Sequence, residues 1–162
     1  MRKLQSLREH LVASVPGIRG NPDKLLTFIE DGAIQFHRGE HLSHQYRIPV
    51  KIVLTDQSGD IDTVMIPLLQ WLSHYQPDLD PDEAVRFQAE LLDSRSWDLA
   101  IEVTLTERVV AKVNCETGRI ESEHRMPEYP IEACPAKHWE LHVKAPGQDD
   151  HELAAEWDSP DG

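Results

Sequence analysis

Three aspartates, Asp56, Asp60 and Asp62, stand close together immediately before a long apolar run. Carboxylates at this density can bind a divalent cation, or can act as an acid and base pair in an active site. The same residue type also favours the first turn of a helix, where its oxygens and negative charge complement the free backbone N–H groups. The neighbouring residues help to separate these three uses.

The match of this segment to a calcium-binding loop of the EF-hand type is incomplete. Asp56, Ser58 and Asp60 fill the first, third and fifth positions. However, Ile61 stands where the loop requires glycine, and Pro67 stands where it requires the bidentate glutamate. An acid and base pair would further need a cleft and a shifted pKa, and the sequence shows neither. A metal-dependent enzyme that uses the three aspartates is therefore the third hypothesis.

The beginning of a helix explains more of the segment. Gly59 permits the turn out of a preceding strand, and Asp60 or Asp62 caps the helix that follows, a contribution of about 1 kcal/mol. Contact with a partner is a further use of the same residues. We therefore predict no catalytic, cofactor-binding or metal-binding residues, and the candidate interface residues are Asp56, Gly59, Asp60, Asp62 and Trp157.

The nine histidines do not form a convincing metal set. His37, His41 and His44 have helical spacing, but the residues between them include glycine and break helical character. His138 and His142 are four residues apart on an expected strand, where they lie too far apart to share one ion easily. The sequence also lacks the glycine motifs of nucleotide-binding proteins and the G-x-S-x-G motif of serine hydrolases.

Composition limits the partners of the chain. Its 162 residues fit one domain, or one domain with a small appendage, and 16 basic against 29 acidic residues give a net charge of −13. This charge disfavours binding to nucleic acid or to an anionic membrane. We expect Cys115 and Cys134 to be free thiols in a reducing compartment, although a disulfide between them stays open. With no signal peptide or apolar run of membrane length, we expect a protein that stays where it is made.

The first third of the chain predicts two helices and two strands. Apolar residues at helical spacing predict a helix over residues 3–15. A second helix is expected to begin at Asn21, a good cap, and to end at the Asp31-Gly32 pair. A short strand is expected over 33–39, and alternating apolar residues predict a clearer one over 46–55.

The rest of the chain predicts one helix and a run of strands. The helix after the aspartates ends near Pro77, and Pro67 requires either a start near Ile66 or a kink. Alternation predicts strands over 85–91 and 97–113, followed by a hairpin turn at 116–118. Two further strands are expected at 139–143 and 153–157.

This order of elements predicts an α+β fold, with two to three helices packed on one face of a mostly antiparallel sheet. We expect an α+β domain over 1–125, a proline-rich extended linker over 126–136 and a C-terminal β-hairpin over 137–158. Residues 159–162 are expected to be a disordered tail.

The chain resembles the tail completion protein R (GpR) family of contractile-tailed bacteriophages and prophages. The resemblance rests on residues 21–34, 55–79, 96–113 and 139–158, which read NPDKLLTFIEDGAI, TDQSGDIDTVMIPLLQWLSHYQPDL, SWDLAIEVTLTERVVAKV and WEL…ELAAEWD. The second and third segments are the most specific. The APGQDDH turn of the expected hairpin is longer than in relatives, so the hairpin geometry is not carried over from the family.

The resemblance implies a structural protein, similar to tail terminators, that acts without catalysis. Such a protein caps the head-proximal end of the tail tube through a ring, commonly six-fold, and prepares it for head joining. Its implied partners are copies of itself, the tail tube, the sheath protein and the head–tail connector. The implied location is the bacterial cytoplasm during assembly and then the virion tail. The second hypothesis is a head–tail joining adaptor that never closes a ring.

Overall fold

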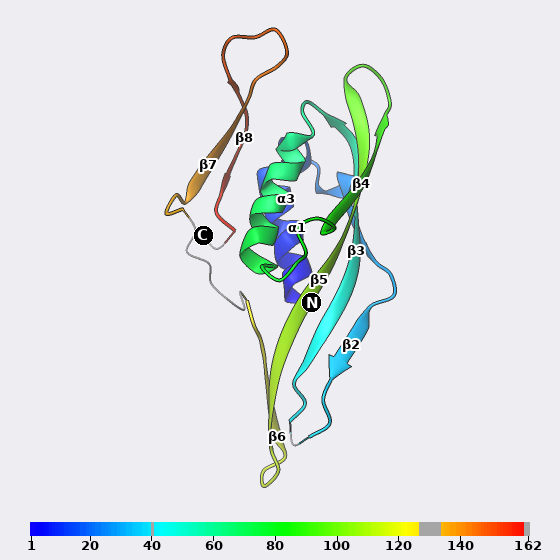
Figure 1. Cartoon of the computed structure of the whole chain (residues 1–162), viewed down its shortest axis with the longest axis vertical. Coiled ribbons are helices and arrows are strands. Elements are labelled where there is room, and N and C mark those ends of the chain that lie inside the picture. Colours follow the sequence, from blue (N-terminus) through cyan, green and yellow to red (C-terminus); the bar gives the residue numbers. More distant parts are fainter. Residues whose placement is uncertain (40, 127–133, 161–162) are drawn as a thin grey trace.

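The structure is a computed structural model that describes residues 1–39, 41–126 and 134–160. A six-stranded antiparallel sheet, a pair of helices and a separate two-stranded hairpin form three successive layers (Figure 1). The elements are α1 (Arg2–Ser14), α2 (Pro16–Arg19), the 3-10 helix η1 (Pro22–Lys24), β1 (Leu25–Ile29), β2 (Ala33–Phe36), β3 (His44–Ser58), α3 (Asp62–Tyr75), β4 (Val85–Leu91), β5 (Ser96–Asn114), β6 (Arg119–His124), β7 (His138–Val143) and β8 (Glu152–Asp158). The predicted α+β class is confirmed.

Two long strands, β3 and β5, form the centre of the sheet. They pair with each other over the whole of β3 and over residues 96–109 of β5, with β1 and β4 outside them in the order β1-β3-β5-β4. At the opposite end of the sheet, β2 pairs with β3 and β6 pairs with β5. All pairs are antiparallel. Along each strand successive side chains point to opposite faces of the sheet, so every second residue belongs to the side on which the helices pack.

The core lies between this sheet and the two long helices. The helix-facing residues of β3 and β5 oppose one another in pairs such as Ile52 and Ile101, which are both fully buried. Leu7 and Leu11 of α1 and Trp71 of α3 cover them and are also fully buried. The predicted helices over 3–15 and after the aspartates are therefore confirmed. No helix within the described ranges is long and apolar enough to cross a membrane.

The predicted helix from Asn21 is wrong. Helical geometry lasts only for the three residues of η1, and the chain then continues as β1, paired with β3 from Leu25 opposite Leu54 to Ile29 opposite Val50. The apolar residues here fit both the helical period and the strand period. Their β-branched and aromatic side chains favour a strand once a neighbouring strand can pair with it. The left-handed residue of the following turn is Asp31, with φ of 53°.

Pro67 lies inside the helix α3. This helix begins at Asp62, so the alternative of a late start near Ile66 is wrong. Most of the predicted linker over 126–136 lies outside the described residues, and the domain boundaries stay a prediction. Cys115 and Cys134 are both free and exposed.

A buried carboxylate joins α1 to the sheet. Glu107 of β5 is fully buried, and it accepts hydrogen bonds from the backbone N–H groups of Arg2 (3.0 Å) and Lys3 (2.9 Å) and from Nδ1 of His124 on β6. The helix has no acidic residue in its own first turn, so Glu107 supplies the missing negative charge there. Burial raises the pKa of Glu107, but the hydrogen bonds outweigh it and hold this pKa below its ordinary value.

We predict that Glu107→Gln lowers the free energy of unfolding at pH 7 by about 1–3 kcal/mol, because the helix loses charge-assisted hydrogen bonds. Since the pKa of Glu107 is depressed in the fold, its stabilisation is present above the ordinary glutamate value of about 4.3 and is lost as the pH falls through the folded value. Urea unfolding over a pH series should therefore show the gap between variant and wild type closing below about pH 4.

The control for this prediction is Glu116→Gln, in the exposed turn between β5 and β6, which should match wild type at every pH. An equal gap between Glu107→Gln and wild type at pH 3 and pH 7 would contradict the role given to the ionised carboxylate.

Candidate assembly surface

The aspartate segment mainly forms the start of α3. Asp60 Oδ1 accepts a hydrogen bond from the backbone N–H of Asp62 at 2.9 Å, and the Asp60 carbonyl accepts one from the Thr63 hydroxyl at 2.7 Å. Gly59 has φ of 85°, which favours glycine, and its carbonyl accepts a hydrogen bond from Trp97 Nε1 at 3.0 Å. The predicted turn is confirmed. The N-cap position of α3 is Ile61, which makes no side-chain cap hydrogen bond, so the predicted cap by Asp60 or Asp62 is wrong in its position, and Asp60 instead binds the Asp62 N–H from the residue before the cap.

Asp56 has a different local role from Asp60 and Asp62. It has φ of 49° at an irregularity in the pairing of β3 with β5, and its carboxylate forms an ion pair of 2.7 Å with Lys24 Nζ. Its backbone N–H donates to Asp98 Oδ1 at 2.7 Å. Among the described residues, no three or more His, Cys, Asp or Glu side chains are grouped so that they could hold a metal ion. The structure therefore gives the carboxylates of Asp56 and Asp60 structural partners within the chain.

The two histidines of β7 have separate local partners. His138 Nδ1 lies 3.0 Å from Asp158 Oδ1, and His142 Nε2 lies 2.9 Å from Glu140 Oε2, both within the C-terminal hairpin. The hydrogen bond to Asp158 raises the pKa of His138 above its ordinary value. His44 belongs to β3, so the helical spacing with His37 and His41 is not realised as a helix.

Trp157 attaches the C-terminal hairpin to the helices. Its side chain is 5% exposed, and its Nε1 donates to Gln70 Oε1 of α3 at 2.6 Å. Beside it, the Arg19 guanidinium donates to the Glu156 carbonyl at 2.7 Å. In this structure Trp157 is thus an anchor within the chain, and its surface is covered by its own helices.

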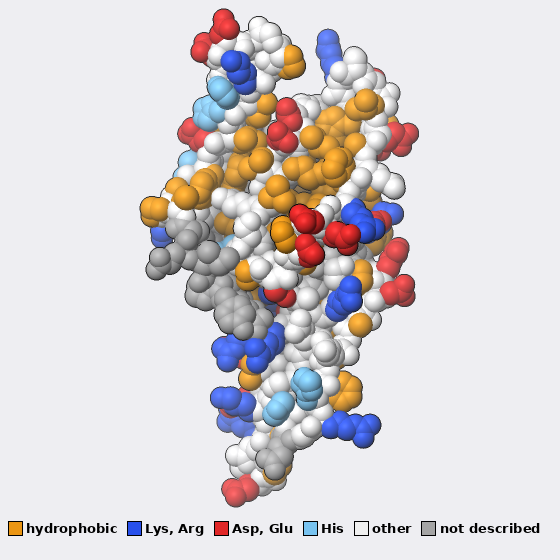
Figure 2. Space-filling view, in the orientation of Figure 1, with side chains coloured by type: hydrophobic (Ala, Val, Ile, Leu, Met, Phe, Trp, Pro, Cys, Tyr) orange, Lys and Arg blue, Asp and Glu red, His pale blue; other side chains and the backbone are white. Residues whose placement is uncertain are grey.

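A large apolar surface lies between α3 and β4, and we call it the apolar trough. Figure 2 shows hydrophobic side chains gathered over this region of the molecule. A groove of about 580 Å³ between the two elements forms part of it, and exposed residues on the same faces extend it. We define the trough by Ile66, Leu69, Leu72, Leu79, Ala84, Val85, Phe87 and Leu91.

The trough is exposed because the helices do not cover β4. Phe87 lies opposite Ile101, and Leu91 lies opposite Trp97, so both belong to the helix-facing side of the sheet. Yet Phe87 is 57% exposed and Leu91 is 79% exposed, whereas their partners on β5 are buried. Grouped apolar side chains exposed to this extent are typical of interaction sites.

One edge of the trough is strongly acidic. The loop between α3 and β4 carries Asp78, Asp80, Asp82 and Glu83 and no basic residue. Figure 2 shows acidic side chains directly beside the hydrophobic patch. A partner that fits this surface should therefore present apolar side chains next to positive charge.

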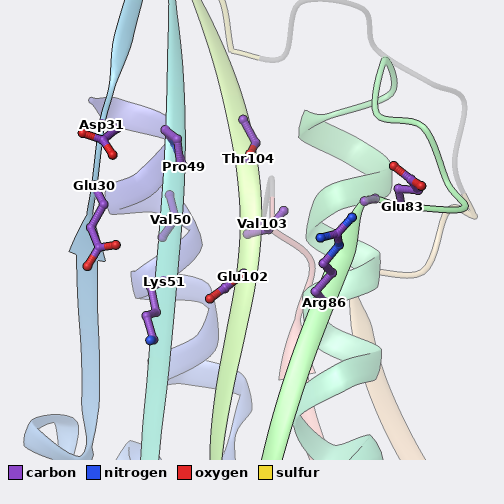
Figure 3. A pocket seen from close by; sticks show the side chains of 11 residues that line it. Glu30, Asp31, Pro49, Val50, Lys51, Glu83, Arg86, Glu102, Val103 and Thr104 are labelled. Atoms are coloured by element: carbon purple, nitrogen blue, oxygen red, sulfur yellow. The ribbon is translucent and has the colours of Figure 1, made fainter.

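The opposite face of the sheet has a different character. Figure 3 shows Glu30, Lys51, Glu102 and Arg86 on the side away from the helices, lining a shallow pocket. Lys51, Glu102 and Arg86 are direct cross-strand neighbours of alternating sign, which stabilises a solvated sheet face. The trough is therefore the better candidate for a docking surface.

Comparison with known proteins identifies the family. The chain matches the family described as P2 phage tail completion protein R (GpR) over residues 1–129. It belongs to the tail completion protein R family. The corresponding protein of Escherichia phage P2, named tail completion protein R, is 35% identical over 115 residues, which cover 68% of this chain and 74% of the phage protein. No solved structure matches the chain significantly.

Membership of the GpR family places the chain among structural components of phage tails and not among enzymes. The family match includes both β3 and β5 as well as α3 and β4, so the trough lies within it. The hairpin of β7 and β8 lies beyond residue 129, although the sequence resemblance also used its WEL and ELAAEWD segments.

Sequence reasoning did not find the trough. The alternation of Val85, Phe87, Ala89 and Leu91 predicts a strand with one apolar face, and β4 confirms it. Only the tertiary arrangement shows that this face has no cover. One sequence feature could have indicated the trough. The acidic loop at 78–83 stands directly before the apolar strand at 85–91, as expected where an exposed apolar surface has a charged rim.

We predict that Asp60→Ala lowers the free energy of unfolding by about 0.5–2 kcal/mol, because the Asp62 N–H at the start of α3 loses its side-chain acceptor, whereas Asp60→Asn keeps an acceptor oxygen there and changes little. Asp62→Asn, at an exposed position, is the matched control. Urea unfolding with and without a chelator measures all three variants. Bound metal at one ion per chain, or loss of stability with chelator, would instead support a metal site.

We predict that Trp157→Ala releases the hairpin while the six-stranded sheet stays folded. Replacing a buried aromatic side chain by alanine costs about 3–5 kcal/mol, so amide hydrogen exchange in β7 and β8 should become much faster than in β3 and β5. Leu153→Ala, in the same strand but 52% exposed, should leave exchange unchanged. Equal protection of the hairpin in both variants would show that Trp157 is not its anchor.

Proposed function

We propose that this chain completes the head-proximal end of a phage tail by associating with copies of itself and docking on the tail tube. The observation that supports this most strongly is the apolar trough in a chain of the GpR family, because an exposed apolar surface of this kind serves contact rather than catalysis. The relative in phage P2 bears the name of a tail completion protein.

The proposed partners follow from the same role. Copies of the chain form a ring at the tube end, and the ring then presents a surface to the head–tail connector, with the sheath protein as a further neighbour. The net charge of −13 suits a protein that meets other proteins and is repelled by a DNA backbone that passes nearby. The proposed location is the bacterial cytoplasm during assembly and then the virion tail.

Deletion of the gene from its phage or prophage tests this function. We predict tails of uncontrolled length, or normal tails that fail to join heads, and restoration of infectious particles by the wild-type gene supplied in trans. Electron microscopy and particle titre are the measurements. Normal infectious particles from the deletion would reject the proposal, and sparse density without a closed ring at the tube end would favour the adaptor hypothesis.

Substitutions in the trough test whether this surface is needed for the proposed function. Leu69→Glu with Phe87→Glu introduces charge at two exposed positions and should leave the fold intact. We predict that this variant fails to complement the deletion, with at least a tenfold loss of titre. The matched control is Leu26→Glu, whose side chain is 44% exposed on the opposite sheet face and which should complement normally.

A further inference from the structure

The strand β4 forms a free edge of the six-stranded sheet (Figure 1). It pairs with β5 on one side, and no other described strand pairs with it. The strand has seven residues, no proline and no irregularity in its register. Natural proteins usually protect such an edge with proline, lysine, a bulge or a covering segment. An edge that lacks these devices can accept a further strand.

The register shows which backbone groups of β4 point away from β5. At the hairpin end, the Leu92 N–H donates to the Ser96 carbonyl at 3.0 Å, so these two residues form a hydrogen-bonded pair. Hydrogen-bonded and non-hydrogen-bonded pairs alternate along antiparallel strands, so residues 86, 88 and 90 bond to β5. The backbone N–H and C=O groups that point outward, to the free edge, are therefore those of residues 85, 87, 89 and 91.

The side chains of the same outward residues belong to the trough side of the sheet. Phe87, for example, lies opposite the buried Ile101 but is itself exposed. Directly opposed residues on neighbouring strands point to one face, so a strand added at this edge would place every second side chain over the trough, where Leu69 of α3 is also exposed. Hydrogen bonding and apolar contact thus require the same partner, an extended segment that is apolar at alternate positions.

The opposite edge of the sheet is partly covered by the chain itself. The Glu30 N–H donates to the Pro49 carbonyl, so the backbone groups of Leu25 and Thr27 on β1 point away from β3. Arg8 donates from Nη1 to the Leu25 carbonyl at 2.6 Å, and the Leu25 side chain belongs to the core. Within the described residues β4 has no such contact, so it is the edge better suited to a partner.

Negative charge lies at one end of this edge. Asp80 and Asp82 are exposed in the loop directly before β4, and Pro81 between them lines the groove of the trough. Neither carboxylate forms an ion pair within the described residues, whereas Asp78 of the same loop accepts a hydrogen bond from the Thr106 hydroxyl at 3.2 Å. A second copy with a net charge of −13 is a poor partner here, and a segment that carries Lys or Arg is complementary.

We propose that β4 accepts a strand from a different protein, an extended segment with apolar side chains at alternate positions and Lys or Arg at the end beside Asp80 and Asp82. This inference rests on the proposed function, in which the chain docks on the tail tube, and it names the edge and the chemistry of the docked segment. Backbone hydrogen bonds set the register of the segment, apolar contacts in the trough add affinity, and its positive end selects against copies of this acidic chain.

A synthetic peptide probes this edge in solution. Its sequence is Lys-Lys-Val-Thr-Val-Thr-Val-Lys-Lys, with Lys at both ends so that either strand direction brings positive charge to the loop. The matched control has the same sequence with N-methyl groups on the central residues, so it lacks the N–H donors of a strand. We expect the first peptide to bind with a Kd below about 1 mM, and the control to bind at least tenfold more weakly. Fluorescence anisotropy of labelled peptides measures both.

Amide hydrogen exchange, followed by NMR, locates the peptide on the wild-type chain. Without peptide, the N–H groups of residues 86, 88 and 90 should be protected by β5, and those of residues 85, 87, 89 and 91 should exchange fast. The peptide should slow exchange of this outward set. Binding without that protection, or no binding up to about 1 mM, overturns the proposal. This measurement does not depend on the folding of any variant.

Proline variants test the edge in the protein. Ala89→Pro removes an outward N–H and no hydrogen bond to β5, so the sheet should stay folded, and Thr27→Pro makes the same change at the opposite edge. We expect Ala89→Pro to weaken peptide binding at least tenfold, and Thr27→Pro to bind like wild type. Circular dichroism and urea unfolding establish that both are folded. Peptide binding by folded Ala89→Pro at wild-type affinity would overturn the proposal.

Neutral variants test the charge of the loop. Asp80→Asn with Asp82→Asn keeps the oxygen that accepts the local hydrogen bond from the backbone N–H of residue 82. We expect about threefold weaker peptide binding or more, with a smaller dependence on salt. Asp149→Asn with Asp150→Asn, in the exposed turn of the C-terminal hairpin, is the matched control. Equal effects of the two pairs would contradict the role given to the loop.

Complementation of the gene deletion separates this inference from the proposed function. Ala89→Pro should lose at least tenfold in titre, whereas Thr27→Pro should complement normally. Normal titre from a folded Ala89→Pro variant that no longer binds the peptide would reject this docking mode alone. Normal particles from the deletion would reject the proposed function itself.

Discussion

The pairing of β3 with β5 determines the shape of the molecule. With 15 and 19 residues, these strands are much longer than the helices of 13 and 14 residues that pack on them. At about 3.4 Å per residue β5 spans about 60 Å, whereas each helix spans about 20 Å. The helices can therefore bury only part of the apolar side of the sheet. The end of the sheet where β2 pairs with β3 and β6 pairs with β5 lies beyond the helix ends, and the trough lies beside the helices, where β4 extends the sheet sideways.

The buried carboxylate of Glu107 determines where along this long sheet the helices lie. Glu107 lies on β5 near the end of the core. Its carboxylate accepts hydrogen bonds from the backbone N–H groups of Arg2 and Lys3 in the first turn of α1. Nε1 of Trp71 on α3 donates a hydrogen bond of 3.1 Å to the Ser6 hydroxyl of α1, so the position of α3 depends on that of α1. A shift of α1 along the sheet would leave a buried charge without its partners, which is far more costly than the loss of a surface contact.

Much of the fold was predictable from the sequence, and the failures have physical causes. Alternation along residues 97–105, which resumes in the same phase at 109–113 after Glu107, predicted a strand, and the spacing of Leu7 and Leu11 predicted a helix. The segment at 25–29 fitted both periods, so pairing with β3 decided its structure. Asp60 was correctly placed at the turn before α3, since its partner Asp62 is close in sequence, whereas the pairing of Asp56 with the distant Lys24 could not be predicted from local pattern. Trp157 and the trough depend on distant elements, and local pattern does not show what covers an apolar side chain.

The net charge of the chain opposes association through its apolar surface. With −13, copies of the chain repel one another in dilute solution, and the loop at 78–83 places four negative charges at the edge of the trough. In the proposed function, neighbours on a tube end are held close, and their high effective concentration offsets this repulsion. A weak apolar contact opposed by like charge therefore favours association on a tube end over association in solution.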